Sequence, residues 1–138
     1  MKVLCKSNNL NGINAQETVA RLKRYIFMPD GEIDLQIGKQ YVVYGIGFRD
    51  NCPWFYICTE DYDDYPKPFS LFFFDIIDKR LSKHWQFCFD HEGCDNLQTT
   101  IAFPEWAGDT KFYMDLVEGE DQAVATFAKY RALIDQEV

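Results

Sequence analysis

The sequence predicts an α+β domain with a single curved antiparallel β-sheet, one N-terminal helix and helices at the C-terminus. Three observations lead to this fold class. Apolar residues recur at helical spacing near both ends of the chain, whereas the middle alternates between apolar and polar residues. Short turn sequences separate the middle segments, which favours antiparallel strands. No linker divides the chain, so residues 1–138 are expected to form one domain.

The N-terminal helix is expected to follow a short opening strand at residues 2–6 and a turn rich in Asn and Gly. Asn14 can cap the helix with its side-chain oxygen, and Glu17 stands three residues later. Residues 29–31, Pro-Asp-Gly, are expected to end the helix. Its apolar face would be formed by Val19, Leu22 and Ile26.

The middle of the chain is expected to form a meander of strands. Residues 33–37 alternate with a period of two, and residues 41–48 are rich in strand formers, with glycines suited to a bent strand. A turn is expected at residues 49–53. The remaining strand-like or strongly apolar segments are 54–58, 69–77, 85–89 and 97–103.

The last third of the chain is expected to be helical. Asp109 can begin a short helix, and Gly119 interrupts it. Glu120 and Asp121 then place negative charge at the start of a final helix, where it interacts favourably with the helix dipole. The apolar stripe of that helix is formed by Val124, Phe127, Ala128, Tyr130, Leu133 and Ile134.

Charge excludes several classes of partner. The chain has 14 Lys and Arg against 22 Asp and Glu, which gives a net charge of −8. Direct binding to nucleic acid or to an anionic membrane is therefore not expected, because both require clustered basic residues. A basic protein partner remains possible. Five Cys without an export signal indicate reduced thiols, so a cytoplasmic location is expected.

Zinc binding is the first chemistry to consider, because His84, Cys88, His91 and Cys94 fall in one window. Their spacing on a strand and its following loop differs from the paired knuckles of structural zinc sites, so no metal or other cofactor is expected, although the sequence leaves the question open. No catalytic residue is expected either. The sequence has no nucleophile elbow, and the Gly-Ile-Gly at residues 45–47 lacks the third glycine of a dinucleotide fingerprint.

The segment at residues 60–65 is the strongest candidate for a binding site. It places four carboxylates within five residues, next to two tyrosines. Such charge speeds encounter with a cationic surface, and tyrosine supplies rigid contact area. The alternative is a solubilising loop whose tyrosines fold back on the sheet. The predicted binding residues are Glu60, Asp61, Tyr62, Asp63, Asp64 and Tyr65.

Trp106 is a further candidate for the binding site, and the sequence allows two placements of its side chain. It precedes a helix, where it either closes the core as a lid or is exposed for contact with a partner. A second acidic group surrounds the join of the last two helices, and helix-start charges explain part of it. This group consists of Asp115, Glu118, Glu120 and Asp121.

A family resemblance is carried by segments 35–46, 54–58, 75–82 followed by Trp85, and 103–106. Together they resemble small bacterial immunity proteins of polymorphic-toxin and contact-dependent growth inhibition systems. The first segment is also similar to the opening hairpin of SH3-like barrels, which implies a partly open barrel. The family resemblance implies a non-enzymatic cytoplasmic protein that binds a cognate toxin domain, often a basic nuclease. No catalytic or binding residue can be carried over from it.

Two other classes of function remain open. The protein could be an enzyme or a small-molecule binder that uses an aromatic-lined pocket on the sheet. The polar candidates for such a pocket are Tyr44, Asp78, His84 and His91. It could also be a structural adaptor without a toxin partner.

Overall fold

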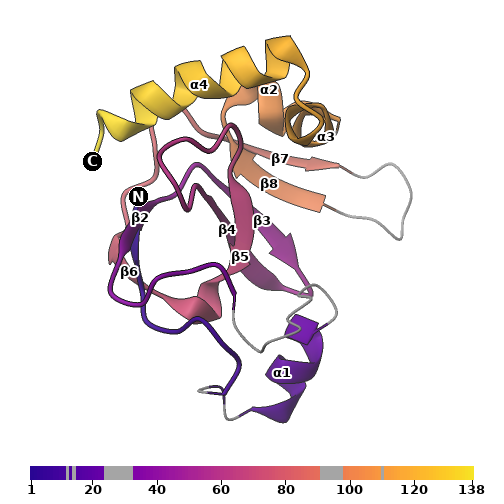
Figure 1. Cartoon of the computed structure of the whole chain (residues 1–138). Helices are drawn as coiled ribbons and strands as arrows, with labels where there is room; N and C mark the ends of the chain where they lie inside the picture. Colours follow the sequence, from indigo (N-terminus) through magenta and orange to yellow (C-terminus); the bar gives the residue numbers. More distant parts are fainter. Residues whose placement is uncertain (12, 14, 24–32, 91–97, 110) are drawn as a thin grey trace.

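The computed structural model describes residues 1–11, 13, 15–23, 33–90, 98–109 and 111–138. In these residues, four α-helices, one 3-10 helix and eight strands form three layers (Figure 1). A five-stranded sheet lies in the middle, with a three-stranded sheet against one face and helices α2, α3 and α4 on the other. Helix α1 lies at the end of the molecule opposite α4 (Figure 1). The predicted α+β class is confirmed.

The strands are divided between two antiparallel sheets, where the sequence predicts one, and they do not close into a barrel. The three-stranded sheet has the order β2–β1–β6 and the five-stranded sheet the order β5–β4–β3–β8–β7. The strands are β1 (Lys2–Cys5), β2 (Gln40–Val42), β3 (Gly45–Arg49), β4 (Cys52–Ile57), β5 (Lys67–Ser70), β6 (Phe74–Asp78), β7 (Gln86–Asp90) and β8 (Gln98–Ala102). The helices are α1 (Gln16–Lys23), η1 (Leu71–Phe73), α2 (Pro104–Ala107), α3 (Phe112–Val117) and α4 (Asp121–Asp135).

The chain changes sheets at Val43 and Tyr44, within the segment predicted as one bent strand. The Val43 N–H donates to Met1 O, beside the three-stranded sheet, at 3.2 Å. The Tyr44 N–H donates to Tyr56 O, in the five-stranded sheet, at 2.9 Å. Both residues are buried. The strand-forming segment therefore contributes β2 to one sheet and β3 to the other.

The prediction of a strand at residues 33–37 is wrong. The N–H of Leu35 donates to the carbonyl of Ile33 at 2.8 Å, a local turn contact in place of a ladder contact. Burial does not follow a period of two either, because Leu35 is buried while Ile37 is 63% exposed. The segment is followed by a turn at Gly38, which has φ of 87°.

The predicted turn between β3 and β4 is a two-residue hairpin loop. Arg49 and Cys52 face each other in the antiparallel register. Asp50 and Asn51 between them have φ of 49° and 60°. This is the backbone of a type I′ turn, which Asp and Asn tolerate better than most residues. The consecutive pairing of β3, β4 and β5 confirms the meander in this part of the chain.

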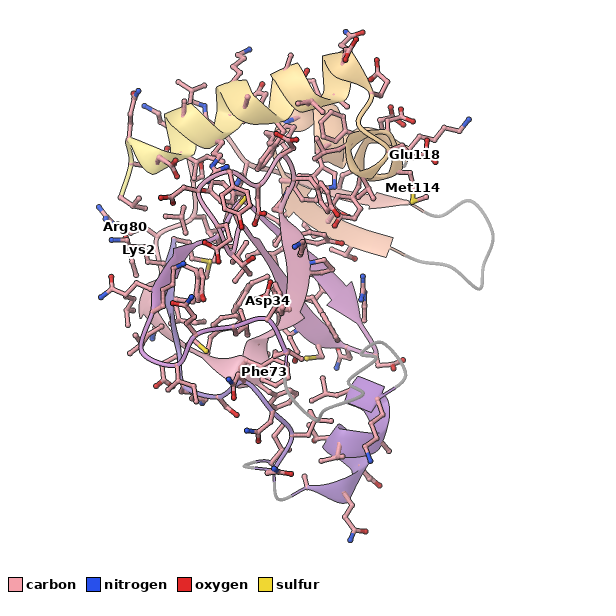
Figure 2. All side chains as sticks on the ribbon, in the orientation of Figure 1. Lys2, Asp34, Phe73, Arg80, Met114 and Glu118 are labelled. Carbon is pink, nitrogen blue, oxygen red and sulfur yellow. The ribbon has the colours of Figure 1, made fainter. Side chains whose placement is uncertain are left out.

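Two hydrophobic cores lie on the two faces of the five-stranded sheet. The first fills the space between the sheets, where Phe73 is fully buried (Figure 2). Its other large members are Val3, Leu35, Tyr41, Val43, Ile46, Phe55, Ile57 and Phe74. The second lies between this sheet and helices α2–α4. It contains Tyr44, Phe103, Trp106, Phe112, Leu116, Phe127, Tyr130 and Ile134.

The helix ends follow the local sequence. Glu120 caps α4, because its carboxylate accepts from the N–H groups of Gln122 and Ala123 at 3.2 and 3.0 Å. Gly119 precedes it with φ of 78°, which confirms the predicted interruption. The predicted cap Asn14 and the predicted stop at 29–31 lie outside the described residues.

Candidate functional site

The acidic loop, residues 60–65, joins β4 to β5 and lies against α4. Arg131 of α4 donates from Nη1 to the carbonyl of Asp63 at 2.8 Å and from Nη2 to the carbonyl of Glu60 at 3.5 Å. Its guanidinium carbon also lies 5.9 Å from the centre of the Tyr44 ring. The last helix therefore holds the main chain of the loop.

Asp63 stabilises the loop from within. Its Oδ2 accepts from the N–H groups of Thr59 and Glu60 at 2.9 and 3.0 Å and lies 3.3 Å from the Thr59 hydroxyl, which also donates to it. Partial burial acts to raise the pKa of this carboxyl. The donors from Glu60 and Thr59, with the charge of Lys67, outweigh burial and hold the pKa below its ordinary value. One of the four predicted binding carboxylates thus has a structural role.

Both ends of the loop are fixed by buried residues. Thr59 is buried, and its carbonyl accepts from Lys39 Nζ at 2.8 Å. Pro66 is fully buried, and its carbonyl accepts from the Tyr113 hydroxyl at 2.9 Å. The adjoining Tyr65 packs against the second core. The ends of the predicted surface loop are therefore part of the folded interior.

The other side chains of the loop face solvent. Tyr62 is 82% exposed, and Asp61 and Asp64 are exposed, while Glu60 is half-buried. The two tyrosines therefore differ, because Tyr65 packs against the second core and Tyr62 extends into solvent. The outward set, Asp61, Tyr62 and Asp64, is presented on a backbone that Arg131 and Asp63 hold in place.

Trp106 is a core residue, so the exposed alternative is wrong and the lid alternative is correct. Its side chain is 6% exposed. Its ring meets the Tyr56 ring edge to face at 4.8 Å and stacks on Tyr113 at 5.5 Å. A Cβ on Gly45 would lie 3.1 Å from this indole, so the ring packs directly on the β3 backbone. Trp106 does not belong to the exposed surface of the loop.

A cleft of about 300 Å³ lies beside the loop, between β2 and the end of α4. Tyr44 forms part of it and donates from its hydroxyl to Asp135 Oδ1 at 2.7 Å. Burial and this hydrogen bond raise the pKa of the Tyr44 hydroxyl well above its ordinary value. Burial also raises the pKa of the Cys58 thiol in the cleft to about 12, which disfavours the thiolate needed for nucleophilic chemistry at neutral pH.

The polar residues considered for an enzyme pocket lie in different environments. Tyr44 pairs with Asp135 in the cleft just described. Asp78 at the end of β6 pairs with Arg80, with 2.7 Å between Oδ2 and Nη2. His84 lies against the Tyr130 ring, with 6.1 Å between ring centres. His91 lies outside the described residues.

Only two of the four residues considered as zinc ligands lie within the described part of the chain. His84 lies in the turn before β7 and Cys88 on β7, whereas His91 and Cys94 lie outside the described residues. Within the described part of the chain, no three His, Cys, Asp or Glu side chains are grouped so that they could hold a metal ion.

An acidic groove of about 450 Å³ between α2, α3 and α4 contains Asp115 and Glu120 of the second acidic group. It also contains Glu105, which accepts from the Tyr130 hydroxyl at 3.1 Å, and Asp109, which accepts from the Lys111 N–H at 2.9 Å. Glu120 caps α4. The carboxylates of Glu105, Asp109 and Glu120 stabilise helix ends and helix packing, which accounts for part of the clustering.

No protein-family model matches the chain, and no curated protein or solved structure shows significant similarity to it. None of the helices among the described residues has the length and apolar character that a membrane crossing requires.

Proposed function

We propose that this chain is a bacterial immunity protein that binds a cognate, basic toxin domain through the acidic loop and neutralises it. The observation that supports the proposal is that some residues fix the backbone of the loop while others face solvent. Asp63 and Arg131 fix the backbone, while Asp61, Tyr62 and Asp64 remain exposed. A binding surface of this kind has its charges and its aromatic anchor in place before the partner arrives.

Preorganisation is what favours tight binding here. A mobile loop loses conformational entropy on association, and that loss reduces affinity. A loop already tied to α4 avoids much of this cost. Tyr62, 82% exposed, offers a large rigid ring of the type that dominates interface energetics.

In this proposal, the negative charge of the protein determines which kind of partner it binds. The net charge of −8 and the exposed carboxylates steer a cationic surface toward the loop. A nuclease fits this description, because it must present positive charge to the phosphates of its substrate. The inhibitor acts by binding, in the cytoplasm of the toxin-producing cell, and performs no turnover.

The test is growth rescue and co-purification with the product of the neighbouring gene, which this proposal expects to be the toxin. Asp61→Lys/Tyr62→Ala/Asp64→Lys should abolish rescue and slow association, and wild-type association should slow as salt rises. A matched control, Glu17→Lys/Glu118→Lys, makes the same charge change at two exposed positions. Glu17 lies on α1, and Glu118 lies at the end of α3 (Figure 2). It should rescue growth like the wild type.

Two outcomes would contradict the proposal. If the loop variant folds and protects as well as the wild type, the loop is not the contact surface. If wild-type protein neither binds nor protects against the neighbouring gene product, the immunity function itself is wrong.

A further inference from the structure

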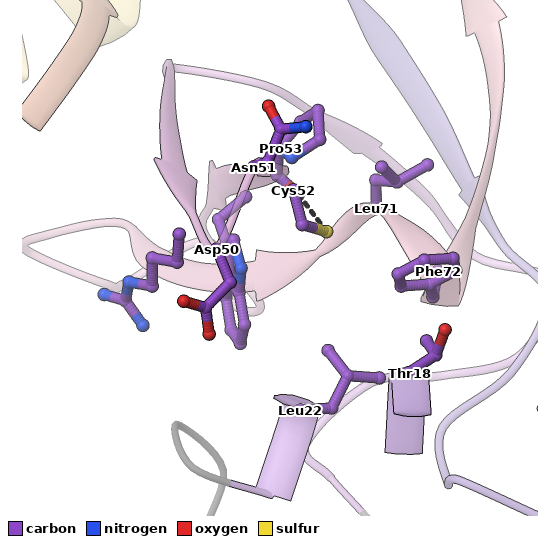
Figure 3. A pocket seen from close by; sticks show the side chains of 10 residues that line it. Thr18, Leu22, Asp50, Asn51, Cys52, Pro53, Leu71 and Phe72 are labelled. Carbon is purple, nitrogen blue, oxygen red and sulfur yellow. Dashed lines mark hydrogen bonds between the residues drawn. The ribbon is translucent and has the colours of Figure 1, made fainter. Parts of the chain in front are cut away.

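A separate cavity of about 160 Å³ lies between α1, the β3–β4 hairpin and η1 (Figure 3). It is far from the acidic loop, because α1 and α4 lie at opposite ends of the molecule (Figure 1). Most of its wall is apolar and comes from all three segments. The apolar residues are Leu22, Pro53, Trp54, Leu71 and Phe72.

The size of this cavity limits what it can hold. An apolar protein cavity of roughly 150 Å³ accommodates one benzene molecule. Drug-sized ligands need about 300 Å³ or more. The space between α1 and the hairpin therefore fits a single six-membered ring, and the exposed Phe72 ring offers it an aromatic partner. The Trp54 ring is a buried part of the wall, and the Arg49 guanidinium carbon, from another lining residue, lies 4.7 Å from its centre.

The cavity also has polar groups in its wall. The Thr18 side chain of α1 and the Asp50 carboxylate at the hairpin turn both line it (Figure 3). A hydroxyl or amino substituent on the ring could donate to either oxygen. An apolar wall with a few polar groups is typical of small-molecule sites.

We propose that this cavity binds a free small aromatic molecule, a single ring that carries one hydrogen-bond donor. The site is independent of the proposed toxin surface, since it shares no residue with the acidic loop. It also differs from the pocket on the sheet considered from the sequence, because Tyr44, Asp78 and His84, the described polar candidates for that pocket, do not line this cavity.

Phenol is the probe for a direct test on the full chain, with methyl-labelled leucine followed by NMR. Leu22 and Leu71 line the cavity, whereas Leu116 is buried in the second core and Leu81 is exposed on the surface. Phenol should shift the first two methyl signals saturably and leave the other two unchanged. Equal shifts at all four leucines, or none at Leu22 and Leu71, would overturn the proposal.

Filling the cavity provides a second test. Thr18→Leu adds apolar volume on a helix that accepts leucine readily, so the chain should still fold. It should weaken phenol binding by about tenfold or more, while the conservative Thr18→Ser should bind within about twofold of wild type. Unchanged phenol binding by a folded Thr18→Leu variant would show that the ring does not enter this space.

Cys52 supplies a third and independent readout. Its Sγ lies 3.6 Å from the Ser70 hydroxyl. Cys52 itself forms part of the cavity wall (Figure 3). In thiol–disulfide exchange, the Cys52 thiolate attacks one sulfur of a small disulfide, the S–S bond of the reagent breaks, and a mixed disulfide forms. The other half of the reagent leaves as a thiolate, which takes up a proton from water. A phenethyl disulfide should occupy Cys52 about fivefold more than an ethyl disulfide at equilibrium, because the ring becomes buried.

Cys88 on β7 is the internal control for this exchange, because it does not line the cavity. It should show no preference for the phenethyl group in peptide mass spectra. Equal occupancy of Cys52 by both reagents would contradict the site. Failure of these tests would leave the loop experiments unaffected, and failure of the loop experiments would leave the cavity tests valid.

Discussion

Arg131 of α4 holds Asp63 by its backbone carbonyl, at 2.8 Å from Nη1, and not by its carboxylate. The most acidic segment of the chain is therefore anchored by a cation without a charge pair to the Asp63 side chain. That side chain is used instead to accept from Thr59 and Glu60. The exposed Asp61 and Asp64 therefore lie on a loop whose backbone is fixed by other residues.

Arg131→Met should loosen the loop and reduce the free energy of unfolding. It removes a charged donor to two carbonyls while keeping the aliphatic packing, so a loss of about 1.5–3 kcal/mol is expected. Chemical denaturation measures this loss, and hydrogen exchange of the amides at residues 60–64 should become faster. Arg131→Lys should recover only part of it, because lysine cannot span both carbonyls. Unchanged exchange in Arg131→Met would mean that the anchor is not needed.

Asp63→Asn should destabilise the chain by about 1 kcal/mol at neutral pH, whereas Asp61→Asn should change it by less than about 0.5 kcal/mol. The pKa of Asp63 is lowered on folding, so its ionised form is stabilised by the folded state. Its contribution is therefore present above the ordinary pKa of 3.8 and is lost as the pH falls through the lower folded pKa. Denaturation curves at several pH values should show the difference between wild type and Asp63→Asn shrinking in acid. A difference that is constant with pH would contradict this role for Asp63.

Gly45→Ala should disturb the packing of Trp106. The added Cβ would lie 3.1 Å from two indole carbons, so the ring must move among the aromatic rings around it. A loss of about 1–3 kcal/mol and a change in near-UV circular dichroism are expected. Gly47→Ala is the comparison, because its Cβ would meet the Tyr56 ring at 3.3 Å and needs a smaller adjustment. A stability of Gly45→Ala equal to that of wild type would show that the ring has room to move.

Trp106→Ala and Tyr62→Ala should separate packing from binding. Trp106 is 6% exposed, and its truncation should cost about 3–5 kcal/mol of stability. Tyr62 is 82% exposed, and its truncation should change stability by less than about 0.5 kcal/mol while weakening binding to the proposed toxin. Thermal unfolding and a binding assay on each variant measure the two effects. A large loss of stability in Tyr62→Ala would place that ring in the fold instead of the interface.

Local sequence was sufficient for the elements whose structure depends on neighbouring residues. Glu120 and Gly119 mark the start of α4, and the Asp50–Asn51 pair forms the predicted turn. The number of sheets could not be predicted in the same way. It depends on a change of hydrogen-bond partner between Val43 and Tyr44. Tyr56, the partner of Tyr44, lies on the next strand of the hairpin, but Met1, the partner of Val43, is distant in sequence.

Residues 33–37 show how tertiary contacts overrode a local pattern. Their alternation is typical of a strand, but the Ile33 N–H is taken by Asn8 O at 2.8 Å and the Gly38 N–H by Cys5 O at 2.8 Å. These contacts with the end of β1 and the loop after it hold residues 33–37 outside the sheets. Hydrophobic periodicity cannot reveal such contacts.

The acidic loop could be recognised from composition, but the contacts that hold it could not. Composition identified residues 60–65 as an unusual surface segment. The anchor Arg131 is 68 positions from Asp63, so no local pattern could connect them. The same limit applies to Trp106, whose burial depends on Tyr56 and Tyr113 from other elements.

The central position of the five-stranded sheet has a consequence for how the molecule comes apart. Each face of that sheet is covered by a different apolar cluster, and Val43 and Tyr44 are consecutive members of the two clusters. Unfolding of either cluster would expose one face of the five-stranded sheet to water and would disturb Val43 or Tyr44, which adjoins the other cluster. The two clusters should therefore unfold together, in a single two-state transition on heating or in denaturant.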